Sequence, residues 1–206
     1  MSRLVTREAM AQALIEGGHF LYQQGWSPAT SSNYSHRINS EQALLTVSGK
    51  HKGQLTADDL LAVNWQGVSL EAGKKPSAET LLHTQLYQWK PEIMAVLHTH
   101  SVNATVLSRL EQGNQLLLEG YELQKAFHGI TTHESTLYLP IFENNQTIPE
   151  LAQQVAAWLA TEPSCPGYLI RGHGLYAWGA SMQETLRHLE AFEFLFACEL
   201  KLRSVR

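Results

Sequence analysis

The sequence predicts a layered α/β domain around a mixed or mostly antiparallel sheet. Short apolar runs typical of strands alternate along the chain with longer segments that begin at helix-capping residues. The two kinds of segment do not repeat in strict strand–helix order, so an all-parallel sheet is not expected. The chain has 206 residues, 44% of them hydrophobic, which is enough to bury a substantial core. It contains no repeat and no linker, and we expect residues 1–206 to form a single domain.

Capping signals and prolines define the expected helices. A Ser or Thr followed three residues later by Asp or Glu marks three of the starts. The first helix contains the Gly17-Gly18 pair, where a kink is expected, and Pro91 bounds the third. The expected helices are residues 6–24, a short one from 56, 77–89, 101–110, a short one at 121–127, 147–161 and a long one from 181.

The expected strands are short and mostly apolar. The run at 93–97 (Ile-Met-Ala-Val-Leu) is continuous, a pattern typical of a strand buried on both faces. Strand order does not follow from such local patterns. The expected strands are residues 34–38, 43–47, 61–65, 93–97, 115–118, 137–142, 167–171 and 175–178.

Composition excludes several classes of function. The formal net charge of −4 provides no strong positive field for nucleic acid or anionic membranes. No apolar run approaches the roughly 20 residues that span a bilayer, and the N-terminal residues lack a signal-peptide core. The two cysteines, Cys165 and Cys198, indicate no disulfide framework. We therefore expect a cytoplasmic protein that binds neither nucleic acid nor membrane.

Three of the ten histidines occur in a context that suggests a metal site. His98 and His100 follow the apolar run, and strand residues two apart project from the same face. His173 stands between Gly172 and Gly174, which permit a tight turn and the close approach of a ligand. Three imidazoles with an open position suit a catalytic Zn²⁺, Fe²⁺, Co²⁺ or Mn²⁺ site.

The simpler explanation of a histidine is a surface residue or a hydrogen-bonded residue in the core. We expect most of the other seven to be of that kind because none has a comparable context. They are His19, His36, His51, His83, His128, His133 and His188.

Three separated motifs resemble the class II aldolase/adducin family. They are residues 76–80 (Pro-Ser-Ala-Glu-Thr), 95–101 (Ala-Val-Leu-His-Thr-His-Ser) and 171–174 (Arg-Gly-His-Gly). Their order and approximate spacing match, and the resemblance extends over nearly the whole chain. It implies a three-layered α/β/α domain around a central, largely antiparallel sheet, assembled as a homotetramer.

The resemblance also implies a set of ligands and a branch of the family. A zinc-type ion, one per subunit, would be held by His98, His100 and His173. Residues 119–127 and 139–144 resemble the branch that dehydrates 5-methylthioribulose 1-phosphate to 2,3-diketo-5-methylthiopentyl 1-phosphate in methionine salvage. The expected activity is therefore that of a zinc-dependent hydro-lyase, with a small phosphorylated keto-sugar as substrate.

Two carboxylates are candidates for proton transfer. Glu122 matches the proposed acid/base position of the dehydratase branch, although a solvated glutamate on a short helix is its simpler explanation. Glu79 could be a fourth metal ligand, a substrate contact or the base. The animal dehydratases carry a cysteine in its place, so its role stays open.

The phosphate of such a substrate needs hydrogen-bond donors. Asn33, Ser48 and Gly49 match family positions that line the phosphate pocket, although Ser48-Gly49 alone would suggest an ordinary turn. Ser77 is expected to open a helix whose first N–H groups can bind an anion.

Two other functions remain open. A class II aldolase of the fuculose or rhamnulose 1-phosphate type would use the same metal-stabilised enediolate to break the C3–C4 bond. An adducin-like domain would keep the fold without the chemistry, but such a domain is expected to have lost ligands. All three histidines and both carboxylates are present here.

Overall fold

The computed structural model describes residues 6–161 and 163–205. Eight strands form one sheet in the order β3-β2-β1-β4-β8-β7-β6-β5. Among the described residues, only β6 and β7 pair in parallel, so the sheet is largely antiparallel as predicted. The strands are β1 (Asn33–Arg37), β2 (Gln42–Thr46), β3 (Leu60–Asn64), β4 (Ala95–Thr99), β5 (Gln115–Glu119), β6 (Thr136–Phe142), β7 (Gly167–Ile170) and β8 (Gly174–Gly179).

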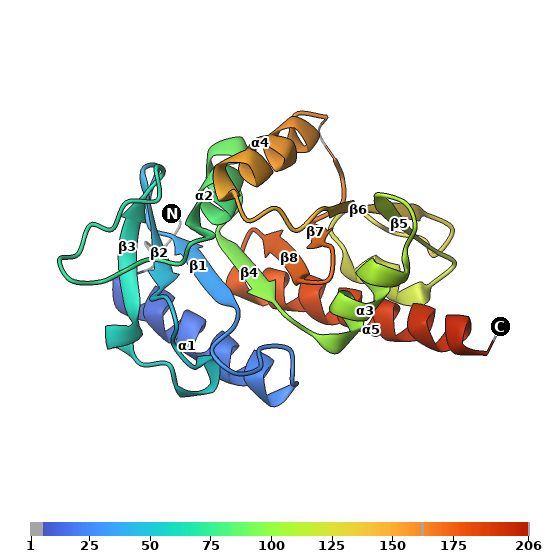
Figure 1. Ribbon diagram of the computed structural model, residues 1–206, viewed down its shortest axis with the longest axis horizontal. Helices are drawn as coiled ribbons and strands as arrows, with labels where there is room; N and C mark the ends of the chain where they lie inside the picture. The colour runs from blue at the N-terminus through green and yellow to red at the C-terminus, as the bar shows by residue number, and fades with distance from the viewer. Residues whose placement is uncertain (1–5, 162, 206) are drawn as a thin grey trace.

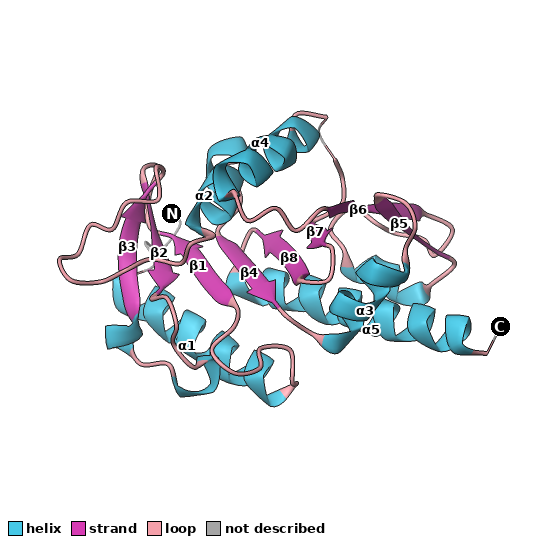
Figure 2. Ribbon diagram, viewed as in Figure 1, coloured by secondary structure: helices cyan, strands magenta, loops and turns pink. Residues whose placement is uncertain are grey.

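Helices cover both faces of this sheet. Helices α2 and α4 lie on one face, and α1, α3 and α5 lie on the other (Figures 1 and 2). This is the three-layered α/β/α arrangement that the family resemblance implied. None of the described helices has the length and apolarity to cross a bilayer. The helices are α1 (Arg7–Gln23), α2 (Thr80–Trp89), α3 (Val102–Leu110), α4 (Ile148–Leu159) and α5 (Met182–Ser204), with short 3₁₀ turns η1 (Lys52–Gln54), η2 (Ala57–Asp59) and η3 (Glu122–Ala126).

Strands β2, β3, β4, β7 and β8 are largely apolar because each side of the sheet faces a core there, whereas β1 is buried but mostly polar. Along β4, Ala95 and Leu97 pack into the core under α1, α3 and α5, whereas Val96 packs into the core under α2 and α4. This alternation is the two-residue period of a strand. By the same period, His98 belongs to the face of the sheet that α2 and α4 cover.

Several element boundaries differ from the sequence-based prediction. Helix α2 begins at Thr80 rather than at Ser77 or Ala78, because the Ser77 carbonyl accepts both the N–H and the hydroxyl of Thr80 in a preceding turn. Helix α1 continues through Gly18 without a break, and a Cβ there would meet the Lys52 carbonyl oxygen at 2.9 Å. The glycine therefore permits the close approach of η1.

Candidate active site

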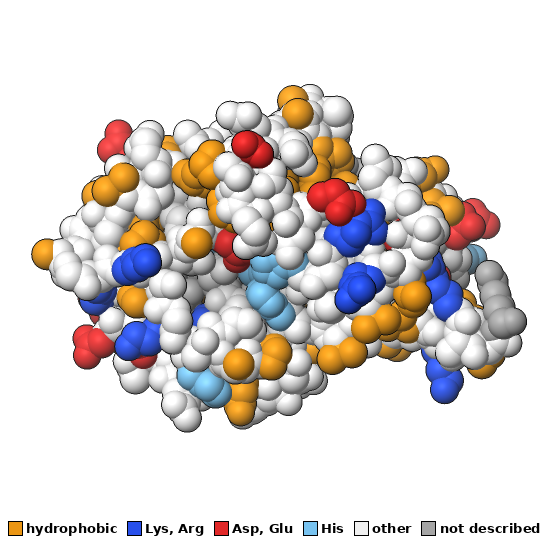
Figure 3. Space-filling view, in the orientation of Figure 1, with side chains coloured by type: hydrophobic (Ala, Val, Ile, Leu, Met, Phe, Trp, Pro, Cys, Tyr) orange, Lys and Arg blue, Asp and Glu red, His pale blue; other side chains and the backbone are white. Residues whose placement is uncertain are grey.

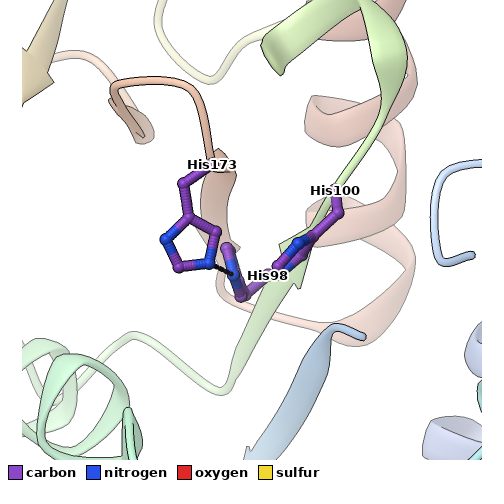
Figure 4. A group of neighbouring side chains, drawn as sticks. All are labelled: His98, His100 and His173. Atoms are coloured by element: carbon purple, nitrogen blue, oxygen red, sulfur yellow. Dashed lines mark hydrogen bonds between the residues drawn. The ribbon is translucent and has the colours of Figure 1, made fainter. Parts of the chain in front are cut away.

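The first two histidines of the candidate site lie at the end of β4. His98 is fully buried within the strand, and its ring stacks on that of Tyr176 with 4.1 Å between centroids and 14° between planes. His100 follows the strand, and its N–H donates to the carbonyl of Trp26 over 2.8 Å. The two rings lie side by side with centroids 4.6 Å apart (Figure 4).

The third histidine lies on the tight loop that joins β7 to β8. Gly172 has a positive φ of +65°, a conformation that favours glycine. A Cβ on Gly174 would stand 1.9 Å from the carbonyl oxygen of Thr99, so no side chain fits there. Arg171 anchors the loop, because its guanidinium donates to three carbonyls at the end of α3 and just beyond it. Together these features hold His173 over the end of β4.

The three imidazoles converge on one point. One nitrogen of each lies within 4.8 Å of the others, and the Nε2 atoms of His98 and His173 are 3.3 Å apart (Figure 4). Two nitrogens bound to one tetrahedral zinc ion at about 2.0–2.1 Å would lie about 3.3–3.4 Å apart. The observed separation therefore fits a pair of ligands on one ion.

Hydrogen bonding prepares His98 for metal binding. Its Nδ1 lies 3.0 Å from the carbonyl oxygen of Leu175, which can only accept, so Nδ1 carries the proton and Nε2 presents its lone pair. Burial, together with the neighbouring histidines, lowers the pKa of His98 well below its usual value. Burial lowers the pKa of His100 to about 4. Both rings are thus neutral near pH 7, the state that binds a metal ion.

Glu79 adds an oxygen donor to this group. Its Oε2 lies 3.5 Å from Nε2 of His98, and its Oε1 lies 3.3 Å from Nε2 of His173. The Asn33 amide donates to the same carboxylate over 2.8 Å. Three imidazole nitrogens and one carboxylate form a donor set that suits Zn²⁺ and several other divalent transition metals. The residues present therefore fit a metal ion.

A pocket of about 180 Å³ opens beside the histidines. In Figure 3, histidine side chains reach the surface near the middle of the face shown. The five positions expected to contact substrate all line the pocket together with two of the histidines. Its lining residues are Thr30, Ser31, Ser32, Asn33, Val47, Ser48, Gly49, Ser77, Glu79, His100 and His173.

Apart from Glu79, the pocket presents small polar groups rather than charged ones. Ser77 does not open a helix, and its hydroxyl accepts the N–H of Glu79 over 3.3 Å. Gly49 has a φ of +75°, which explains the glycine at this turn. The Lys50 ammonium pairs with Asp59 at 2.8 Å, so it is engaged in an ion pair. Hydroxyl and N–H donors are thus the groups that this pocket offers to an anion.

Glu122 lies away from this pocket. Its side chain is 74% exposed and accepts a hydrogen bond from Lys125 over 2.6 Å. The 3₁₀ turn η3 that carries it packs against α5, where the ring of Phe127 lies 4.5 Å from that of Phe192. Within the described chain, the structure brings Glu79 to the histidines but leaves Glu122 at the surface.

Two buried residues near the site were not singled out from the sequence. Lys52 is 1% exposed, and burial lowers its pKa to about 8. His83 is fully buried and contacts the side chain of Asn33. Helical spacing from Glu79 to His83 is visible in the sequence, but it indicates only a shared helix face.

The chain belongs to the class II aldolase and adducin family. The profile of the Class II Aldolase and Adducin N-terminal domain matches residues 12–200. Solved structures of the same fold include YgbL from Klebsiella pneumoniae, with a TM-score of 0.81 and 24% identity over 96% of this chain and 91% of that one. The L-fuculose-1-phosphate aldolase from Thermus thermophilus has a TM-score of 0.76 and 26% identity over 96% and 95% of the two chains.

Much higher identity links the chain to one group within the family. It is 66% identical over 199 residues to the methylthioribulose-1-phosphate dehydratase of Pseudomonas aeruginosa, covering 97% of both chains. The dehydratase of the same name from Pseudomonas fluorescens is 66% identical over 201 residues, covering 98% of this chain and 97% of that one.

Proposed function

We propose that this chain dehydrates 5-methylthioribulose 1-phosphate to 2,3-diketo-5-methylthiopentyl 1-phosphate in methionine salvage. The observation that carries the proposal is the 66% identity to a methylthioribulose-1-phosphate dehydratase over 97% of both chains. The convergence of three histidines and Glu79 beside a polar pocket supports it, because the chemistry needs such a site.

The reaction removes a proton from C3 and hydroxide from C4. The obstacle is the negative charge that develops on the neighbouring ketone oxygen as the C3 proton leaves. A divalent ion, which we propose to be one Zn²⁺ per chain, supplies Lewis-acid stabilisation of that charge when bound. His98, His100 and His173 are the proposed ligands. The neutral state of His98 and His100 near pH 7 supports this assignment.

Glu79 and the polar pocket have separate proposed roles. Glu79 lies close enough to two of the histidines to complete the ligand set or to accept a proton beside it. The hydroxyl and N–H donors of Asn33, Ser48, Gly49 and Ser77 are proposed to hold the substrate phosphate. Such donors orient a phosphate without a cation in the pocket wall.

Glu122 is proposed to be the acid/base that accepts the proton from C3 and then donates a proton to the hydroxide leaving C4, which departs as water. Because it is exposed and distant from its own pocket, this role requires that a second copy of the chain bring it to the site. Exposed apolar side chains on α3 at helical spacing, Val102, Val106 and Leu110, support association of copies. We propose a homotetramer on the resemblance to the family, and a cytoplasmic location on the sequence.

An assay with three sugar phosphates tests the proposed function. The purified protein loaded with zinc is offered methylthioribulose 1-phosphate, and separately fuculose and rhamnulose 1-phosphates. We expect diketone formation from the first substrate and no aldehyde from the others. Aldehyde release without dehydration would assign the chain to the sugar-phosphate aldolases instead. A His98→Ala variant is the control for contaminating activity.

A further inference from the structure

One stripe of helix α2 faces one row of strand β1 behind the candidate metal site. Residues four apart on a helix rise by about 6 Å, and residues two apart on a strand by about 6.5 Å. The two repeats therefore stay in step over two turns of helix. The facing side chains are Glu79, His83 and Tyr87 at the start of and along α2, and Asn33, Ser35 and Arg37 on β1.

Polar contacts between these two rows form a continuous chain. The hydroxyls of Tyr87 and Ser35 are 2.7 Å apart, and the Ser35 hydroxyl lies 2.8 Å from Nδ1 of His83. Nε2 of His83 contacts Oδ1 of Asn33, and Nδ2 of Asn33 lies 2.8 Å from Oε2 of Glu79. Ser35, His83 and Tyr87 are each no more than 2% exposed, so they form this chain away from solvent.

The carboxylate at one end sets the direction of every hydrogen bond in the chain. The NH₂ group of Asn33 donates to Oε2 of Glu79, so the carbonyl oxygen of Asn33 faces His83. Nε2 of His83 must then carry the proton, and Nδ1 must accept. Ser35 therefore donates to Nδ1 and accepts from Tyr87.

The opposite direction of these hydrogen bonds is unfavourable. A proton on Nδ1 of His83 would make Nε2 an acceptor, and the Asn33 amide would have to rotate to donate to it. The amide oxygen of Asn33 would then face the Glu79 carboxylate. Two acceptors at hydrogen-bond distance in a buried site repel each other. Only one tautomer of His83 is compatible with an Asn33 amide that donates to Glu79.

We propose that His83 is a positioning residue that fixes the Asn33 amide and, through it, holds the Glu79 carboxylate beside His98 and His173. The inference rests on the proposed function in taking this group as the metal site. The sheet supports the arrangement, because Asn33 pairs directly with His98 between β1 and β4. Burial lowers the pKa of His83 to about 3, so the ring stays neutral and its single proton is available to Asn33.

Nitrogen NMR of the metal-free protein tests the tautomer directly. With ¹⁵N-labelled histidine, we expect His83 to carry its proton on Nε2 at every pH from 6 to 9. A His83→Gln sample assigns the resonance. A proton on Nδ1, or a protonated ring in this range, would overturn the proposal. This measurement needs neither metal nor substrate.

Two substitutions test the effect on the site. His83→Leu removes the donor to Asn33, and we expect zinc affinity in a chelator competition to fall about 10–100-fold, as for other groups that orient metal ligands. His83→Gln keeps an N–H near the Nε2 position and should recover most of that loss. His188→Leu is the matched control, because His188 is likewise buried, at 2% exposed, but packs against Phe127, away from the site.

The outcomes separate this proposal from the proposed function. Unchanged zinc affinity in folded His83→Leu, or equal losses in His83→Leu and His83→Gln, would overturn the positioning role. If His83→Leu does not fold, Ser35→Ala replaces it. We expect Ser35→Ala to lose less zinc affinity than His83→Leu would. An unchanged zinc affinity in Ser35→Ala would count against the proposal. If the wild-type protein binds zinc and shows the Nε2–H tautomer but does not dehydrate the substrate, the proposed function is wrong. The positioning role of His83 would still stand.

Discussion

The ring of His98 is fixed by a hydrogen bond from its Nδ1 to the carbonyl oxygen of Leu175 on the neighbouring strand, 3.0 Å away. Because this bond commits one nitrogen, the other points to His173 with its lone pair free. The ring is therefore oriented before any ion binds, which is how a preorganised ligand gains affinity.

Removal of this ring should abolish metal binding and activity together. In His98→Ala, one of three converging imidazoles is missing, and we expect less than stoichiometric zinc by elemental analysis after dialysis. His128→Ala is the matched control, since the ring of His128 is 86% exposed. Full zinc content in His98→Ala would argue against His98 as a ligand.

Metal removal should be reversible and should lower thermal stability. An ion that binds only the folded chain at 100 times its Kd stabilises it by about 2.7 kcal/mol. For a chain of this size, that corresponds to a rise in Tm of about 5–10 °C. We expect a strong chelator to remove activity and lower Tm, and zinc to restore both. If only a different metal restores activity and Tm, that metal rather than zinc is the cofactor.

The strands and the three histidines were predictable because their signals are local. An apolar run indicates a buried strand, and His98 and His100 follow it at the spacing that puts both on one face. The glycines around His173 also carry their own reason: one has a positive φ, and the other leaves no room for a Cβ. The spacing of His98 and His100 needs no knowledge of the strand order, whereas the lack of room at Gly174 depends on β4 lying next to β8.

Local patterns did not predict the residues around the histidines, and only the family resemblance placed Asn33 and Glu79 beside them. Asn33 pairs with His98 only because β1 lies next to β4, and local patterns do not determine strand order. His83 was expected to be a surface or structural residue, and its contact with Asn33 depends on the same neighbours. The exposure of Glu122 likewise follows from how η3 packs on α5.

The metal-free protein should lose stability as the pH falls from about 6.5 toward 5. Burial lowers the folded-state pKa of His83 to about 3, and it also lowers those of His36 and His188. Below the unfolded value of about 6.5, the unfolded chain binds protons that the folded chain does not. Each such histidine then costs up to about 1.4 kcal/mol per pH unit. For His83, the loss continues until the pH reaches the folded-state pKa.

Urea unfolding at pH 7.5, 6.5, 5.5 and 5.0 measures this effect. We expect the free energy of unfolding to fall progressively, and the fall to be shallower in His83→Gln because one of these protons is absent. A free energy that stays constant over this range would contradict the buried neutral state of the three rings.

The tight loop under His173 should not tolerate a side chain at Gly174. A Cβ at this position would stand 1.9 Å from the carbonyl oxygen of Thr99, so the pairing of β4 with β8 must shift. We expect Gly174→Ala to cost about 1–3 kcal/mol or more, a fall in Tm of about 3–10 °C, with weaker zinc binding. Gly113→Ala is the control, since a Cβ there meets nothing within 4 Å. Equal Tm values for the two variants would contradict this account.

The role of Glu122 can be tested separately from metal binding. We expect Glu122→Gln to retain zinc, because its side chain is 74% exposed and absent from the histidine pocket. Its kcat should fall about 10²-fold or more if it transfers the proton. A near-normal kcat would move that role to Glu79, which already lies 3.3 Å from His173.

Mixing two inactive variants determines whether Glu122 acts across copies of the chain. His98→Ala supplies an intact Glu122, and Glu122→Gln supplies intact histidines, so a shared site is rebuilt only where the two chains meet. Random mixing in a cyclic oligomer should restore about a quarter of the sites. Co-refolded samples should then regain activity that neither variant shows alone. If the mixture stays inactive although mixed oligomers form, Glu122 does not complete a neighbour's site, and its exposed position then argues against a catalytic role.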